Sequence, residues 1–137
     1  MSSHDYRYGG ARALVELHER HLRQFLIIWK EADARAIALP ESSDPNRVSR
    51  EALLAHVLGC AARYLTWICE QMRVAAPEIE QWPEPKGLTE HAEDYLEKVL
   101  AAWRWPLASL READAYEPAY ESRWGRPTAS TRCSSTP

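Results

Sequence analysis

Glycine is scarce in this chain, with 5 glycines among 137 residues, whereas proline occurs 9 times. The sequence has no glycine-rich phosphate loop, no Cys-x-x-Cys pair and no recognisable Ser-His-Asp arrangement. It also lacks the alternation of apolar and polar residues that predicts strands, and it contains no internal repeat. These absences leave an all-α fold as the expectation, in a chain long enough for one domain with a sizeable core.

An excess of positive charge and a long apolar run are missing as well. Seventeen basic and twenty acidic residues give a net charge of −3, whereas a nucleic-acid-binding protein normally carries a basic patch. The longest uncharged apolar runs, such as Leu26–Trp29, are too short to cross a bilayer, and the N-terminus has no apolar signal core. We therefore expect no nucleic-acid partner, no membrane partner and a cytoplasmic location.

The three cysteines, Cys60, Cys69 and Cys133, lack the spacing of a metal clip. Cys60 and Cys69 are nine residues apart on one expected helix, so their side chains face opposite sides and cannot form a disulfide. We interpret Cys60 as a packing residue. Cys69 has no candidate base beside it in the sequence, so we interpret it as structural rather than as a nucleophile.

Three long segments carry apolar residues at steps of three and four, the period of a helix with one buried face. The first runs from about Gly10 to Ile37, and its expected buried stripe is Val15, His18, Leu22, Phe25, Trp29, Ala32 and Ala36, widened by Leu14, Leu26 and Ile28. The second covers Ser49–Val74, and its expected stripe is Leu53, Val57, Cys60, Tyr64, Trp67 or Ile68, and Gln71. Ser49 is the expected N-cap of this helix.

A third helix is expected to start at Thr89 as N-cap and to kink at Pro106. Its apolar residues are Ala92, Leu96, Val99, Trp103, Leu107 and Leu110. A proline-rich connection precedes it, with Trp82 lying over the bundle. Residues 128–137 are rich in serine and threonine and have no large apolar side chain, so we predict that they are disordered. The domain therefore covers residues 1–127, as a bundle of three long helices in which a fourth is missing.

The segment E-A-L-L-A-H-V-L-G-C-A-A-R-Y follows a long first helix and a proline-rich turn, and it places His56 early in the second helix. Together with Trp124 and Gly125 near the end, this pattern resembles the DinB-like superfamily over about residues 10–127. The resemblance implies an up-and-down four-helix bundle that is commonly a homodimer. It also implies a divalent metal, zinc or nickel, bound by one histidine of the second helix and an H-x-x-x-H pair of the last.

Only His56 matches one of these implied ligands, because no histidine follows Pro118. The metal site is therefore expected to be incomplete and its metal binding weak. A frame-shift after Pro127 would explain the missing helix, since one encoding of the tail reads in another frame as the start of an amphipathic helix with a histidine. A genuine short variant is the alternative.

The resemblance implies a metal-dependent enzyme acting on a small-molecule substrate, a thiol transferase or a hydrolase, impaired by loss of the last helix. The alternative is a non-catalytic helical module that pairs through an exposed apolar face. By spacing alone, His56 is instead a core-edge histidine hydrogen-bonded to a neighbouring helix. His18 is expected to be a satisfied core histidine, and the tryptophans are expected to fill the core rather than line a pocket.

Overall fold

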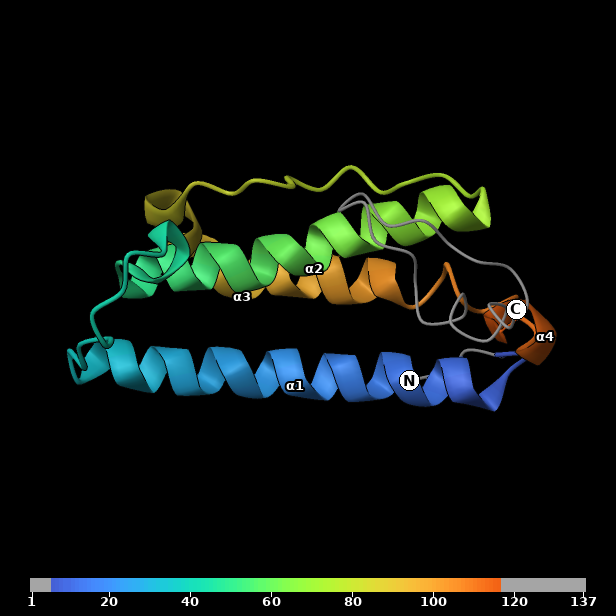
Figure 1. Ribbon diagram of the computed structural model, residues 1–137, viewed down its shortest axis with the longest axis horizontal. Coiled ribbons are helices and arrows are strands. Elements are labelled where there is room, and N and C mark those ends of the chain that lie inside the picture. Colours follow the sequence, from blue (N-terminus) through green and yellow to red (C-terminus); the bar gives the residue numbers. More distant parts are fainter. Residues whose placement is uncertain (1–5, 117–137) are drawn as a thin grey trace, which may run out of the picture.

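The computed structural model describes residues 6–116, which form a helical bundle (Figure 1). The long helices are α1 (Gly9–Ala34), α2 (Arg50–Met72) and α3 (Pro85–Trp103). A short 3-10 helix, η1 (Pro45–Arg47), precedes α2, and a short α4 (Glu112–Tyr116) follows α3. This part of the chain contains no strand, so the all-α class is confirmed. The predicted disordered tail, residues 128–137, lies outside the described residues, and so does the domain boundary at residue 127.

The order of helix directions differs from the expected up-and-down bundle. The helices α1 and α2 are antiparallel as predicted, but α2 and α3 run in the same direction (Figure 1). The connection between them, residues 73–84, returns along α2 and is called the crossover below. Extended at about 3.3 Å per residue, it reaches roughly 40 Å. The 23-residue α2 is about 34 Å long, so the crossover is just long enough to span it.

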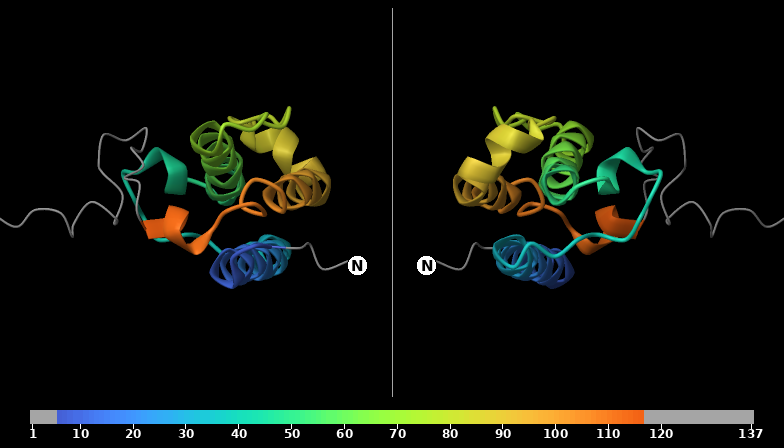
Figure 2. Two further views of the ribbon diagram at one scale, coloured as in Figure 1. Left: turned by 90° about the vertical axis from the view of Figure 1, so that its right-hand side faces the viewer. Right: turned by 90° about the vertical axis from the view of Figure 1, so that its left-hand side faces the viewer.

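Seen along its length, the bundle places its three long helices at the corners of a triangle (Figure 2). Its core is centred on α2, whose fully buried residues include Leu54, Leu58, Ala62 and Leu65. The predicted stripe of α2 is therefore displaced by about one position, and Tyr64 within it is 46% exposed. The reason is that α2 is apolar around most of its circumference, so the period alone does not fix its orientation.

On α1 the predicted stripe is correct at Val15, Leu22 and Trp29, which are buried. Leu14 and Ile28, which were expected to widen this stripe, are 64% and 65% exposed. Both side chains therefore lie on a face of α1 turned away from α2 and α3.

Two tryptophans connect the helices through hydrogen bonds of their indole groups. Trp29 Nε1 of α1 donates to the Arg50 carbonyl at 2.8 Å, and Trp103 Nε1 of α3 donates to the Ala61 carbonyl at 3.0 Å. A buried indole N–H needs a hydrogen-bond acceptor, and both of these have one. Both rings can therefore be buried without leaving an unsatisfied polar group. The expectation that tryptophans fill the core is confirmed for these two. The expectation is wrong for Trp105, which is 65% exposed. Trp82 lies on the crossover and is 75% exposed.

The helix starts follow local capping chemistry. The hydroxyl of Ser49 accepts a hydrogen bond from the Ala52 amide at 3.0 Å, which confirms the predicted N-cap of α2. The helix α3 begins at Pro85 and not at Thr89, because proline is preorganised for the first helical position. Thr89 is inside the helix, and its hydroxyl donates to the Pro85 carbonyl at 3.0 Å.

The helices end earlier than predicted. Ala36 and Arg73 adopt left-handed conformations with φ of 53° and 56°, and these residues close α1 and α2. In both cases the next amide donates to a carbonyl five residues back at 3.0 Å. Glycine is the usual residue at such a helix end. Neither α1 nor α2 has a glycine there, which is why the sequence predicts that both helices end later. Pro106 lies beyond α3, which ends at Trp103, so the predicted kink at Pro106 is wrong.

Among the described helices, α2 alone is long and apolar enough to cross a membrane by length and composition. Just over half of its apolar window is buried inside the bundle, and a mostly buried core helix is one kind of helix that passes the same test. The expected absence of a membrane partner and the cytoplasmic location stay predictions.

Candidate functional site

Three reactive side chains of α2 lie together on one face of the helix. His56, Cys60 and Arg63 are spaced by four and three residues, which places them on successive turns. The sulfur of Cys60 lies 3.7 Å from Nδ1 and 3.9 Å from Nε2 of the His56 ring. Arg63 donates from Nη2 to the same sulfur at 3.1 Å. We call these three residues the α2 cluster.

The crossover holds Arg63 in place. Arg63 Nη1 donates to the Gln81 carbonyl at 2.6 Å, and the guanidinium carbon lies 3.7 Å from the centre of the Trp82 ring. Although it is charged, Arg63 is only 9% exposed. Its hydrogen bonds and the aromatic ring offset the cost of removing this charge from water.

Gly59 makes this close approach possible. A Cβ atom at this position would lie 2.8 Å from Arg63 Nη1 and 3.1 Å from Pro83 Cδ. No larger residue fits without moving the guanidinium or the crossover. The glycine of the sequence motif is therefore explained by the contact between α2 and the crossover.

A cavity of about 420 Å³ opens beside the α2 cluster. Its walls come from η1, α2, the end of the crossover and the first residue of α3. They include Pro45, Asn46, Ala52, Ala55, His56, Arg63, Trp82, Pro83, Glu84 and Pro85. The volume suits a small molecule. His56 and Arg63 both line it, and Cys60 is partly exposed beside them.

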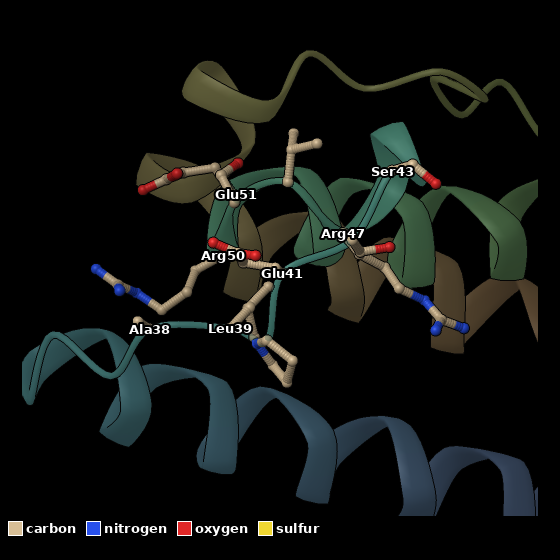
Figure 3. Close-up of a pocket in the computed structure, with 11 residues that line it drawn as sticks. Ala38, Leu39, Glu41, Ser43, Arg47, Arg50 and Glu51 are labelled. Atoms are coloured by element: carbon tan, nitrogen blue, oxygen red, sulfur yellow. The ribbon is translucent and has the colours of Figure 1, made fainter.

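A larger hollow of about 860 Å³ lies on the loop before α2 (Figure 3). Arg47 and Arg50 extend away from one another there. Arg50 is paired with Asp33 at 3.0 Å, and Arg47 is paired with Asp44 at 3.6 Å. Because both arginines are already paired with carboxylates and no reactive group converges on the hollow, it is not the candidate site.

The described residues do not fit a zinc or nickel site. No three His, Cys, Asp or Glu side chains among them lie close enough to share a metal ion. His56 and Cys60 supply two potential ligands, whereas catalytic zinc sites use three protein ligands and structural sites use four. The predicted Trp124 and Gly125 element lies outside the described residues.

Other predicted residues have simpler surroundings. His18 packs on Trp103 with ring centres 4.4 Å apart, and its buried Nδ1 has no hydrogen-bond partner within residues 6–116. The expectation that His18 is fully satisfied is therefore wrong for that part of the chain. Burial, together with the neighbouring His21, lowers the pKa of His18. Cys69 is 2% exposed, and burial raises the pKa of its thiol, which agrees with a structural role.

Sequence reasoning missed Cys60 and Arg63 as partners of His56. The available signal was the spacing His-x-x-x-Cys-x-x-Arg, which places all three on one helical face. The contact with Gln81 had no such signal, because it joins residues 18 positions apart across the crossover.

Comparisons of the chain with models of protein families, with curated proteins and with solved structures find no match. The resemblance to the DinB-like superfamily therefore stays a prediction.

Proposed function

We propose that this protein binds a small molecule in the cavity between α2 and the crossover and uses the α2 cluster to act on it. The observation that supports the proposal is the convergence of an imidazole, a thiol and a guanidinium beside a cavity of about 420 Å³. Cavities of this kind, with a few converging polar groups, are the usual place of small-molecule chemistry.

Each member of the α2 cluster brings a different capability. The thiol of Cys60 can act as a nucleophile, and the imidazole of His56 can carry a proton. The guanidinium of Arg63 stabilises a neighbouring negative charge. Glu84 adds one acidic group to the cavity wall, so the walls carry both signs of charge. This arrangement favours a polar, zwitterionic ligand.

The proposal keeps the small-molecule substrate that the family resemblance implied, but it assigns no step to a metal. A metal-dependent thiol transferase or hydrolase would need ligands in addition to His56 and Cys60, and residues 6–116 do not provide them.

The site can be tested by screening a library of small amino acids and peptides with amide chemical-shift mapping. We expect binders to shift the amides of residues 52–63, of Trp82 and of Glu84. Ala52→Phe should fill the cavity and abolish these shifts, whereas Ala101→Phe, on an exposed position of α3, should leave them unchanged. Shifts confined to residues 38–51, around the larger hollow, would overturn the assignment.

A second candidate function rests on a different face. Four large apolar side chains on α1 are between 41% and 66% exposed, namely Leu14, Leu17, Ile27 and Ile28. Leu14 and Ile28 are two heptads apart, a spacing that suits helix pairing. We propose that two copies associate through this face, which would make the chain a homodimer.

Sedimentation of the purified chain tests this association. We expect a dimer that dissociates in the double variant Leu14→Lys and Ile28→Lys. Ala101→Lys, an exposed change on α3, should leave it intact. A monomer at all concentrations would exclude the homodimer, and a dimer that resists the double variant would place the interface elsewhere.

A further inference from the structure

The sulfur of Cys60 has a charged donor on one side and an imidazole on the other. Arg63 Nη2 lies 3.1 Å from the sulfur, and the His56 ring lies 3.7 Å away. A thiol is a weak hydrogen-bond acceptor, whereas a thiolate is a strong one. Cys60 is thus the thiol of α2 that lies between a charged donor and an imidazole, which is the kind of surrounding in which reactive cysteines occur.

The charge of Arg63 is fixed in position. The Gln81 carbonyl and the Trp82 ring hold the guanidinium from the other side, and only 9% of the residue is exposed. Screening by water is weak for a group buried to this degree, so its effect on the sulfur is stronger than that of a surface arginine.

Cys69 provides a comparison on the same helix. It is 2% exposed within the hydrophobic core, and burial raises the pKa of its thiol. Cys60, in contrast, is partly exposed and lies beside the cavity-lining side chains of His56 and Arg63. Two cysteines of one helix thus occupy opposite environments, one inert and one accessible.

We propose that Cys60 is a reactive thiol that forms a mixed disulfide with a low-molecular-weight disulfide entering the cavity. This inference rests on the proposed small-molecule site and names its chemistry. The Cys60 sulfur attacks one sulfur of R–S–S–R, the S–S bond of the reagent breaks, and a Cys60–S–S–R bond forms. The other half leaves as RS⁻ and takes up the proton that Cys60 loses, which His56 can carry. Cys60 is oxidised and the departing half is reduced, so no further oxidant is needed.

The experiment uses the full chain carrying Cys133→Ser, so that Cys60 and Cys69 are the remaining thiols. The protein is mixed with oxidised glutathione at neutral pH, and glutathione adducts are followed by intact mass and located by peptide mapping. We expect one adduct, on Cys60, to form about tenfold faster than on N-acetylcysteine amide, because a charge-assisted hydrogen bond has an effect of this size. Cys60→Ser should abolish it, and Cys69→Ser should leave it unchanged.

Arginine variants test the cause of the reactivity. Arg63→Gln, which removes the charge, should slow adduct formation about tenfold. Arg63→Lys keeps the charge but cannot reach the Gln81 carbonyl and the Cys60 sulfur together, so it should recover only part of the rate. If Arg63→Gln does not fold, the comparison of the folded chain with N-acetylcysteine amide still decides the matter. Modification of Cys60 no faster than this reference, or modification of Cys69 first, would overturn the proposal.

The cavity-filling variant Ala52→Phe separates this inference from the proposed function. Fast reaction of Cys60 that slows in Ala52→Phe supports both. Fast reaction in both proteins supports the reactive thiol and argues against the cavity as the binding place. Slow reaction in a chain whose cavity still binds a ligand by chemical-shift mapping overturns the reactive thiol alone.

Discussion

Two glycine-to-alanine substitutions in helices should have opposite effects on stability. Alanine is better than glycine inside a helix by about 0.5–1 kcal/mol, so each substitution would stabilise the protein if nothing else changed. At Gly87 in α3, an added Cβ meets no atom within 4 Å. We therefore expect Gly87→Ala to raise the free energy of unfolding by about 0.5 kcal/mol.

Gly59 differs because the space around it is filled. The new Cβ would lie 2.8 Å from Arg63 Nη1, and the guanidinium is held by Gln81 and Trp82 and cannot simply turn aside. Losing a buried hydrogen bond from a charged group costs about 1.5–3 kcal/mol, which exceeds the gain in helix propensity. Gly59→Ala should therefore lower the free energy of unfolding by about 1–2 kcal/mol.

Urea unfolding followed by circular dichroism measures both variants against the parent protein, and a thermal scan should show a loss of about 4–8 °C for Gly59→Ala. The difference between the two changes in the free energy of unfolding is the most informative quantity, because both variants add the same methyl group to a helix. If Gly59→Ala proves as stable as Gly87→Ala, the crossover does not press on α2, and the cavity beside the α2 cluster has a different shape.

Three further predictions concern the metal, the core and pH. Calorimetric titration should show only weak zinc or nickel binding, and a stoichiometric sub-micromolar site that disappears in His56→Ala would contradict the incomplete ligand set. Leu65→Ala, at a fully buried position, should cost about 2–5 kcal/mol in urea unfolding, and Val48→Ala, at an exposed position, should stay within about 0.5 kcal/mol. A loss smaller than 1 kcal/mol at Leu65 would show that α2 presents another face. Burial, and to a smaller extent the neighbouring His21, lowers the pKa of His18. The folded protein therefore favours the neutral imidazole, and the stability that this form contributes is fully present above pH 6.5 and is lost as pH falls through the lowered pKa. Unfolding measured between pH 7 and 5 should therefore show a smaller acid-induced loss in His18→Gln, and an equal loss in both proteins would exclude His18 as the cause.

The sequence predicts only one of the three residues of the α2 cluster as a functional residue. His56 is a histidine beside an apolar stripe, and the family resemblance implies that it is a metal ligand. Cys60 was interpreted as a packing residue, because a thiol in an apolar helix usually is one. Its contact with Arg63 depends on the rotamer of a long side chain, and the Gln81 carbonyl that fixes this rotamer belongs to the crossover.

Local chemistry in the sequence was enough to determine the three helices and the start of α2. The apolar period, the Ser49 cap and the turn-forming prolines act through residues that are close in the sequence. They therefore favour the same helices and turns whatever the tertiary fold is. Tertiary structure alone decided the direction of α3, the buried face of α2 and the surroundings of Cys60. A helix that is apolar on most sides takes its orientation from the neighbours that pack on it, and the crossover sets those neighbours by returning along α2. The close approach at Gly59 and the fixed charge of Arg63 are consequences of that return, and no short-range pattern encodes them.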